Sequence, residues 1–463
     1  MILSNLLRKS HIAECLWIPL KLLSLLEVDR LKKSLTIYKK YDGTEIKLFK
    51  VNDAFIGVPI HHFKLPKGIP DSRTAGAIIK FEFTSPYRKG QPEAVCQFRE
   101  YWLSGGTGFI IEAVPGWGKT CVCIKLMSIV GRTSLVIVPR SNLVKQWVSR
   151  LIEHSTLKRS EIGIAMGGVV EYINKKVVVG LVHTVSKDRF MYDDNFKNYF
   201  GMIVFDEVDR SVPPQTFSTV ASMFPARIRI GVSAILSRKD GLDVIFKKHI
   251  GQHYIKADDE GTTLKPKVII HNYNTSSGEV PKYLQKLQRR GVLLSRLAEN
   301  NNRNGKICGY VKLIYNSGRQ CLVISDRIKQ LQSIKRFLVS TGGIPDSEIG
   351  FYVRQLYSDN GDSKKTVTES ERKRVTQDCK IILATYGMMS LGTDIVSLAG
   401  LIMATPQSEV KQTIGRIVRK MKGKQQPVIV DIVDSAYPDA VGWGHARQRY
   451  YAQENLLVKH KGQ

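Results

Sequence analysis

The chain of 463 residues is 43% hydrophobic, which is enough to build several cores and excludes a disordered protein. Its 70 Lys and Arg outnumber its 41 Asp and Glu, and the net charge of +29 suits a polyphosphate partner such as DNA or RNA, although a basic protein with no specific partner fits the composition equally well. No apolar run reaches the roughly 18–20 residues of a membrane helix, and the seven Cys include no CxxC pair, so we expect no membrane partner, no disulfide or zinc framework, and a cytoplasmic rather than secreted protein.

The first 84 residues divide into two segments. Residues 1–30 are apolar but interrupted by charges and lack a small-residue cleavage site, so they predict an N-terminal extension rather than a signal peptide. This extension is either an amphipathic segment or a stretch upstream of the true start. Residues 31–84 predict a small β-rich (α+β) module, which either contacts DNA or braces the rest of the chain. Its expected strands are Thr36–Tyr38, Ile46–Phe49 and Ala54–Val58, with a turn signal at Asp42–Gly43.

Two α/β domains are expected to follow, at residues 85–255 and 301–440. Each contains short runs rich in Val and Ile that alternate with helical stretches, the pattern of a parallel sheet buried on both faces. Residues 256–300 are expected to form a linker and a helical segment, and residues 441–463 a basic and aromatic tail. That tail could contact nucleic acid or pack back on the second domain. Within the second domain, the charged stretch 357–374 predicts an exposed loop.

The segment "AVPGWGKT", Ala113–Thr120, lies between an expected strand and an expected helix. This context and its glycines predict a phosphate-binding loop, in which backbone N–H groups approach the phosphates. Lys119 would reach the β- and γ-phosphates, and the Thr120 hydroxyl would ligate Mg²⁺. The strict pattern has Gly where this chain has Ala113, and the variant A-x-x-G-x-G-K-T is fully matched.

Two further segments complete the expected catalytic centre. In "MIVFDEVD", an acidic pair follows an apolar strand: Asp206 would hold Mg²⁺ through water, and Glu207 would orient and deprotonate the attacking water. The segment "QTIGRIVR" begins at Gln412 and places Arg416 and Arg419 three residues apart, which predicts one helix face that stabilises charge on the γ-phosphate. Each segment by itself is also compatible with an ordinary solvated surface.

Together these segments resemble the superfamily-two helicases and translocases over about residues 85–435. "DEVD", "GVSAILSRKDG", "NNRNGKI" and "FIGVP" resemble the XPB-like branch and phage UvsW-type branch-migration helicases in particular. The resemblance implies two tandem RecA-like domains with ATP and Mg²⁺ in the cleft between them. It also implies that Gln91 reads the adenine. The other nucleotide-binding residues that it implies are Pro115, Gly116, Trp117, Gly118, Lys119, Thr120 and Asp394, and the implied nucleic-acid contacts are Arg140, Ser141, Thr184, Arg327 and Thr385.

One position departs from the family pattern. The family has Ser-Ala-Thr where this chain has Ser233-Ala234-Ile235. The Thr hydroxyl couples the ATP site to nucleic-acid movement, and Ile235 can neither donate nor accept that hydrogen bond. ATP hydrolysis could survive the change while strand separation is weakened or is carried by other contacts.

The resemblance predicts an ATP-dependent DNA helicase or translocase that acts on branched or forked DNA, by branch migration and fork regression, in recombination, repair or replication. Replication and recombination proteins are then possible partners, in the cytoplasm of a phage or bacterial host. Three alternatives remain at this stage: an RNA helicase, the motor of a restriction complex, and an ATP-switched clamp that binds nucleic acid without unwinding it.

Overall fold

The computed structural model contains two compact units, Met1–Asp259 and Glu260–Gln463, which are described separately. The residues that the structure describes are 7, 9–38, 43–65, 68–114, 116–191, 193–207, 212–234, 243–257, 263–274, 290–358, 363–389, 395–408 and 410–461.

The first unit is built on an eight-stranded sheet in the order β10-β9-β11-β8-β12-β13-β7-β14, in which only β10 is antiparallel to its neighbour. The short runs rich in Val and Ile form the adjoining central strands β11-β8-β12-β13-β7, which confirms the expected parallel α/β fold. The strands are β7 (Gly108–Glu112), β8 (Ser134–Val138), β9 (Ile162–Met166), β10 (Val169–Val170), β11 (Val177–Leu181), β12 (Met202–Asp206), β13 (Ile228–Ser233) and β14 (His253–Lys256).

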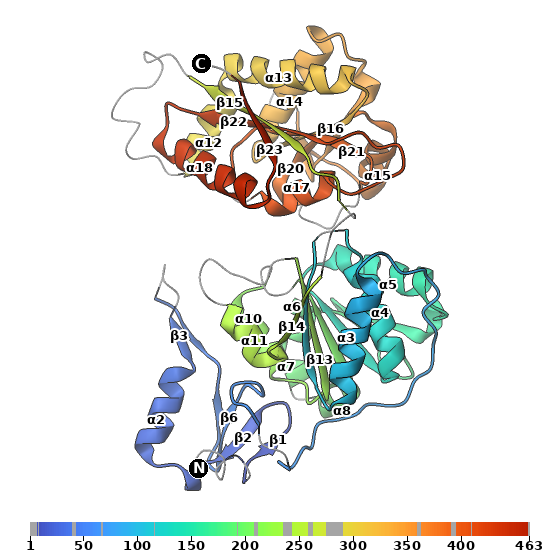
Figure 1. Ribbon diagram of the computed structural model, residues 1–463, viewed down its shortest axis with the longest axis vertical. Coiled ribbons are helices and arrows are strands. Elements are labelled where there is room, and N and C mark those ends of the chain that lie inside the picture. Colours follow the sequence, from blue (N-terminus) through green and yellow to red (C-terminus); the bar gives the residue numbers. More distant parts are fainter. Residues whose placement is uncertain are drawn as a thin grey trace. The chain divides into compact units, whose positions relative to one another are not determined.

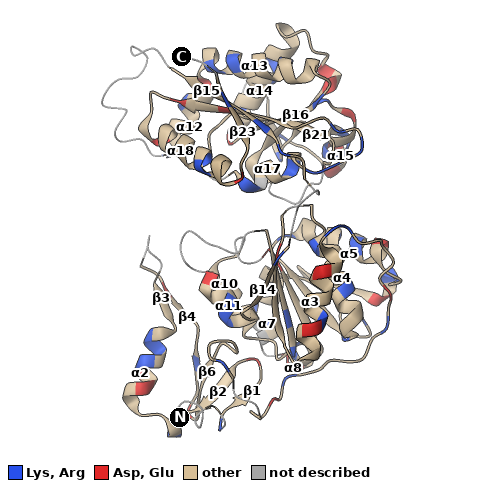
Figure 2. Cartoon of the chain, viewed as in Figure 1, with Lys and Arg blue, Asp and Glu red and all other residues tan. Residues whose placement is uncertain are grey.

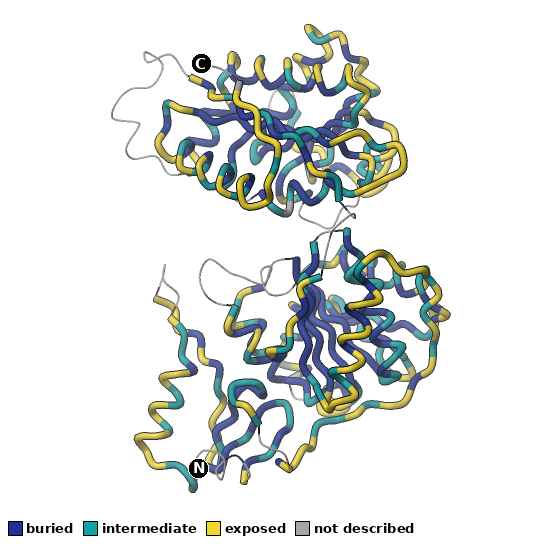
Figure 3. Tube along the Cα trace, in the orientation of Figure 1, coloured by how far each residue is buried: buried dark blue, intermediate teal, exposed yellow. Residues whose placement is uncertain are grey.

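Helices cover both faces of this sheet (Figure 1). On one face lie α3 (Gln91–Leu103), α4 (Lys119–Val130) and α5 (Ser141–His154); on the other lie α6 (Val182–Val185), α10 (Pro214–Ala221) and α11 (Asp243–Ile250). Successive strand residues point to opposite faces, so β8 contributes Val136 and Val138 to one core and Leu135 and Ile137 to the other. The central strands therefore form a buried core, whereas the exposed residues lie on helices, loops and edge strands (Figure 3).

A small antiparallel sheet, β1-β2-β6-β5, precedes the parallel sheet and shares one hydrophobic core with its α10 and α11 face. Its strands are β1 (His11–Ile12), β2 (Leu16–Pro19), β5 (Lys50–Val51) and β6 (Phe55–Val58). A hairpin of β3 (Thr36–Tyr38) and β4 (Glu45–Lys47) and the helix α2 (Leu25–Ser34) lie beside it. Residues 1–30, which we expected as a separate extension, thus supply two strands of the sheet that contains β6, because Leu16 and Ile18 are buried against the same core. The expected turn at Asp42 lies outside the described residues.

Arg229 on β13 fixes this small sheet to the parallel sheet. Its side chain is 1% exposed and donates hydrogen bonds to the carbonyls of Ala221, Phe224, His249 and Glu14. Burial lowers the pKa of Arg229 to about 10, which still leaves the guanidinium charged at neutral pH. The β-rich module is therefore joined to the first parallel-sheet domain by a buried charged group as well as by apolar packing.

The second unit contains a seven-stranded sheet with every described pairing parallel, in the order β17-β20-β16-β21-β22-β15-β23. Helices α13 (Asn301–Asn316) and α14 (Ile328–Ser340) pack on one face, and α16 (Tyr386–Met389), α17 (Lys411–Ile417) and α18 (Pro438–Gln453) pack on the other. The strands are β15 (Lys267–Tyr273), β16 (Gln320–Ser325), β17 (Ile349–Tyr352), β20 (Ile381–Thr385), β21 (Leu398–Met403), β22 (Val428–Asp434) and β23 (Leu457–Lys461).

Three segments of this unit differ from the sequence expectation. Part of the expected linker forms β15, whose Val268 and Ile270 are buried in the core, and part of the expected tail forms β23 at the sheet edge beside it. The expected loop at 357–374 contains β19 (Lys364–Thr366), which pairs with β18 (Gln355–Tyr357), and then α15 (Glu369–Asp378). Thr368 and Glu371 form a capping box that starts α15 and explains why this very polar stretch is helical.

Candidate nucleotide-binding site

The phosphate-loop sequence lies between the end of β7 and the start of α4, as its pattern predicts. Gly116 and Gly118 have φ of 91° and 98°, a left-handed backbone that residues with a side chain rarely adopt. The Ala113 N–H donates to the Ser233 carbonyl at 3.0 Å, which fixes the loop to the neighbouring strand β13. The loop thus turns directly into the N-terminus of α4, and the N-terminus of a helix favours an anion because of its first-turn N–H groups and its dipole. Pro115 lies outside the described residues.

Gln91, expected to read adenine, lies beneath this loop and is 1% exposed. Its Oε1 accepts from the Arg88 N–H at 2.8 Å, and its Nε2 donates to the Trp117 carbonyl at 2.7 Å. Arg88 also donates from its guanidinium to the Gly116 carbonyl at 2.8 Å. In this structure Gln91 and Arg88 therefore support the loop directly, and contact between Gln91 and adenine stays a prediction.

We expect Gly118→Ala to weaken ATP binding at least tenfold. The φ of 98° is strained for alanine, and an added Cβ would lie 2.3 Å from Gln91 Nε2, so the loop or the glutamine must shift. Equilibrium titration with a fluorescent ATP analogue measures the loss. The matched control is Gly105→Ala, also at positive φ (93°) but with no atom within 4 Å of the added Cβ; equal losses in the two variants would contradict the role given to the loop.

Lys119 and Thr120 are the first two residues of α4. The Lys119 ammonium donates to the Ala113 carbonyl at 2.8 Å and lies 3.5 Å from the Val114 carbonyl, so it is held within the loop. Thr120 is half-buried beside it. A cation and a hydroxyl at a helix N-terminus are the groups that a magnesium-bound polyphosphate requires.

Asp206 ends β12, and its position relative to the loop follows from the sheet register. Asp206 pairs with Val232, which pairs with Ile111 on β7, so the carboxylate lies two strands, or roughly 10 Å, from the strand that enters the loop. Asp206 is 7% exposed, and its Oδ2 accepts from the Trp147 indole N–H at 2.7 Å, which orients the carboxylate. Burial, with a smaller contribution from the Asp206 charge, raises the pKa of the Cys123 thiol on α4 well above its usual value.

Glu207 leaves the strand by a sharp turn, with φ of 52° and an N–H that donates to the Val232 carbonyl at 3.0 Å. Its side chain is half-exposed, unlike that of Asp206. The two carboxylates therefore occupy different environments at one edge of the sheet. This arrangement fits Mg²⁺ held by hard oxygen ligands on Thr120 and Asp206, with Glu207 left to act on water.

The nucleic-acid candidates of the first unit lie in two environments. Arg140 is the N-cap of α5, shortly after the end of β8, and Ser141 is its first residue and is exposed. Thr184 is 3% exposed, and its hydroxyl accepts from the Gly167 N–H at 3.0 Å, which ties two loops together. Thr184 is thus a loop-fixing residue in this structure, whereas Ser141 is accessible to a ligand.

In the second unit, Arg327 precedes α14 and joins it to α12 (Arg290–Glu299). Its guanidinium donates to the Ser295 hydroxyl at 3.0 Å and to the Gly291 carbonyl at 2.6 Å. Thr385 ends β20 and is half-exposed. Contact of Arg327 with a nucleic-acid backbone requires that its side chain exchange these hydrogen bonds for phosphate.

The expectation that Arg416 and Arg419 share a helix face is wrong. Helix α17 ends at Ile417, so Arg416 lies in its last turn while Arg419 lies beyond it. Arg419 forms an antiparallel bridge with Thr263, and the Leu264 N–H donates to the Val418 carbonyl at 2.6 Å. This pairing draws the chain out of helical geometry. Asp394, Ile235 and the Gln412 side chain lie outside what the structure describes.

The sequence analysis did not identify two buried ion pairs that support the chain before α17. Arg303 on α13 pairs with Asp434 at 2.6 Å and also donates to the Ala404 carbonyl. Arg447 on α18 pairs with Asp431 at 2.8 Å and donates to the Gln407 carbonyl at 2.7 Å. Acidic residues inside the apolar run "VIVDIVD" were the available signal, because a buried carboxylate needs a partner.

Comparison with known proteins finds one matching family model and several relatives that are named as helicases. Residues 84–238 match the family model "Type III restriction enzyme, res subunit". The relatives include "Putative ATP-dependent RNA helicase L396" of Acanthamoeba polyphaga mimivirus, 26% identical over 91% of this chain and 79% of that protein. They also include "Probable helicase D10" of Escherichia phage T5, 29% identical over 70% of this chain and 67% of that protein.

Among solved structures, S. cerevisiae Dbp5 bound to RNA and ADP BeF3 matches 81% of this chain and 90% of its own, with 15% identity and a TM-score of 0.53. This likeness confirms the fold of tandem RecA-like domains. No helix among the described residues is long and apolar enough to span a membrane. The family match over residues 84–238, the helicase relatives and the phosphate loop with its acidic pair agree, and the chain is similar to ATP-dependent helicases.

Proposed function

We propose that this protein is an ATP-dependent DNA helicase or translocase that remodels branched or forked DNA. One observation supports the ATPase activity in particular. The phosphate loop and the Asp206–Glu207 pair lie at the same end of the first sheet, where its parallel strands end. The net charge of +29, distributed over helices of both units, favours a polyphosphate substrate (Figure 2). The branched substrate rests on the XPB-like and UvsW-type sequence features.

In this proposal each residue of the site has one role. Gly116, Gly118 and Lys119 bind the phosphates of ATP, Thr120 and Asp206 hold Mg²⁺, and Glu207 takes the proton of the attacking water. Bound Mg²⁺ would supply positive charge that offsets the negative charge of the phosphates during phosphoryl transfer. Gln412, Arg416 and Arg419 of the second domain stabilise the γ-phosphate as its charge develops. The remaining nucleotide contacts are Gln91, Pro115, Trp117 and Asp394.

The nucleic-acid contacts in the proposal are phosphate contacts. Arg140, Ser141 and Thr184 act on the first domain, and Arg327 and Thr385 act on the second. Such contacts hold the backbone and carry no base information, so binding is expected to be sequence-independent and to weaken steeply as salt rises. Proteins of replication and recombination are the partners that a fork-remodelling motor would meet.

The test is the ATP hydrolysis rate without nucleic acid and with single-stranded DNA, duplex DNA, a four-way junction or structured RNA. We expect the junction to stimulate hydrolysis most strongly, and a junction-dissociation assay then reports movement directly. Equal stimulation by the junction and by a simple duplex would contradict a branched substrate. Stimulation by RNA alone would instead establish an RNA helicase, the activity in the name of the mimivirus relative.

A second candidate function is an ATP-switched clamp, which the residue at position 235 favours. With Ile235 in place of the family's Thr, ATP turnover could be uncoupled from strand movement. A clamp hydrolyses ATP on DNA but dissociates no junction. Ile235→Thr is then the informative variant, because a gain of junction dissociation would locate the uncoupling at this position.

A further inference from the structure

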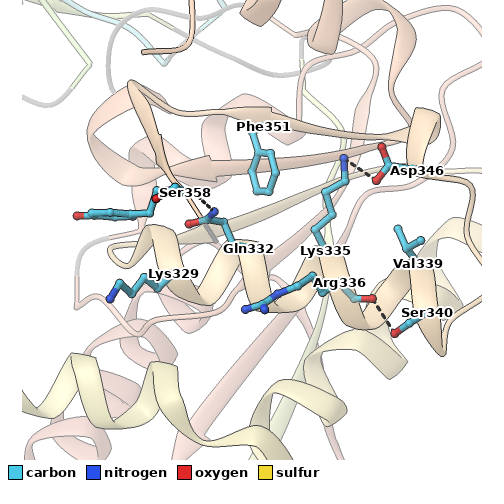
Figure 4. Close-up of a pocket in the computed structure, with 10 residues that line it drawn as sticks. Lys329, Gln332, Lys335, Arg336, Val339, Ser340, Asp346, Phe351 and Ser358 are labelled. Carbon is cyan, nitrogen blue, oxygen red and sulfur yellow. Dashed lines mark hydrogen bonds and ion pairs between the residues drawn. The ribbon is translucent and has the colours of Figure 1, made fainter. Parts of the chain in front are cut away.

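A groove in the second unit is lined by residues that have no role in the function proposed above. It is a cavity of about 800 Å³ between α14 and the strands β17 and β18 (Figure 4). Its lining is basic, aromatic and polar: Lys329, Gln332, Lys335, Arg336, Val339, Ser340, Asp346, Phe351, Tyr357 and Ser358.

The amphipathic pattern of α14 places the basic residues in this groove. Leu331, Ile334 and Leu338 are buried against the sheet, so the opposite side of the helix carries Lys329 and Arg336 to the surface. These two residues are seven positions apart, which is roughly 10 Å along the helix axis. A polyanionic strand that lies along α14 can therefore contact both cations.

The groove has an excess of positive charge. Its one carboxylate, Asp346, is 71% exposed and already pairs with Lys335 at 2.9 Å. Among the residues that the structure describes, neither Lys329 nor Arg336 forms an ion pair. Lys364 on β19 adds a fourth cation near the rim, with its ammonium 5.5 Å from the centre of the Tyr357 ring. An anionic ligand would thus meet several unneutralised cations at one place.

Two aromatic rings form part of the groove wall. The Lys329 ammonium lies 5.6 Å from the centre of the Tyr357 ring, and that of Lys335 lies 5.4 Å from the centre of Phe351. Gln332 donates to the Tyr357 carbonyl at 2.8 Å, so the strand that carries the tyrosine is fixed to α14. Both rings are only half-buried. Cations beside accessible aromatic faces are the combination that binds phosphates and stacks bases.

We propose that this groove binds single-stranded DNA, with its phosphates on Lys329 and Arg336 and a base against Tyr357. On binding, a nucleobase would replace the Lys329 ammonium over the Tyr357 ring. The displaced ammonium would then contact a phosphate of the strand. Single-stranded rather than duplex DNA fits because the bases of a duplex are stacked on each other and cannot enter an aromatic-walled cavity. The inference rests on the proposed function and adds to it a strand-binding site on the second unit alone.

The test compares two groove variants with a charge-matched control. The first variant, Lys329→Glu/Arg336→Glu, reverses two exposed cations; the control, Lys312→Glu/Lys373→Glu, reverses two exposed lysines of the same unit that do not line the groove. The second variant is Tyr357→Ala, with Tyr357→Phe as the conservative replacement. Fluorescence anisotropy with labelled single strands of DNA and of RNA, and with a DNA duplex of the same length, gives the affinities. Thermal unfolding checks that each variant is folded.

We expect the double reversal to weaken single-strand binding at least tenfold and to make the slope of log K against log salt shallower by about 1.4, the loss of two phosphate contacts. Tyr357→Ala should weaken it about tenfold, with recovery in Tyr357→Phe. Duplex affinity should fall much less. Equal losses for duplex and single strand, equal losses in the control, or a preference of the groove for RNA over DNA would overturn the proposal. If the wild-type protein bound no nucleic acid, the proposed function itself would fail instead.

Discussion

Replacing Glu207 with glutamine is expected to reduce ATP turnover by a factor of about 10²–10⁴ while ATP and DNA binding stay close to wild type. Glutamine has the size of glutamate and keeps the turn at φ 52°, where the backbone bond to Val232 is retained. It cannot accept a proton from the attacking water. The rate under single-turnover conditions measures the loss, and titration with a non-hydrolysable ATP analogue measures binding.

Lys119→Ala tests ATP binding, whereas Glu207→Gln tests activation of the attacking water. It removes the ammonium that lies within the phosphate loop, so we expect it to lose ATP binding and turnover together and to keep DNA binding. Glu93→Gln, an exposed glutamate on α3, is the matched control for the carboxylate change and should hydrolyse ATP normally. Full turnover in Glu207→Gln would show that another group activates the water.

The parts of the fold that could be predicted are those with a strong local signal. The run "SLVIV" is short and rich in β-branched and apolar residues, which favours a strand covered on both faces. It forms β8, and all five of its residues are buried. The phosphate loop was predictable because Gly116 and Gly118 are required by their backbone angles, whatever surrounds them. In both cases the cause lies within a few residues of the sequence.

The rest depends on contacts between distant residues. Strand β23 has exposed side chains and little strand signal of its own, and it forms because β15 offers an unpaired edge. Helix α17 ends early because Thr263, far away in the sequence, pairs with Arg419. Gln91 looks like a ligand-binding residue by its motif, yet its Nε2 is engaged by the loop that it supports and its Oε1 by the Arg88 N–H. Sequence patterns locate such residues and leave their partners undetermined.

A buried ion pair is the clearest example of residues whose partners could not be predicted from the sequence. Arg303 and Asp434 are both fully buried, 131 residues apart, and joined by two hydrogen bonds of 2.6 and 3.0 Å. Their burial carries a desolvation cost, which their mutual contact largely offsets. The same arginine holds the Ala404 carbonyl, so the pair links α13, the end of β22 and the chain that leads to α17.

Asp434→Asn is therefore expected to destabilise the second unit by about 3–5 kcal/mol, because it leaves the Arg303 charge buried and uncompensated. Hydrogen exchange of the β22 amides measures this loss, and β12 of the first unit serves as the internal reference that should not change. Asp378→Asn, which removes an exposed pairing with Arg374, is the matched control and should cost less than about 1 kcal/mol. Equal protection of β22 in the two variants would contradict a structural role for the pair.

The double replacement Arg303→Met/Asp434→Leu removes both charges. We expect it to regain much of the lost protection, since the penalty arises from the unpaired ion rather than from the absence of the pair.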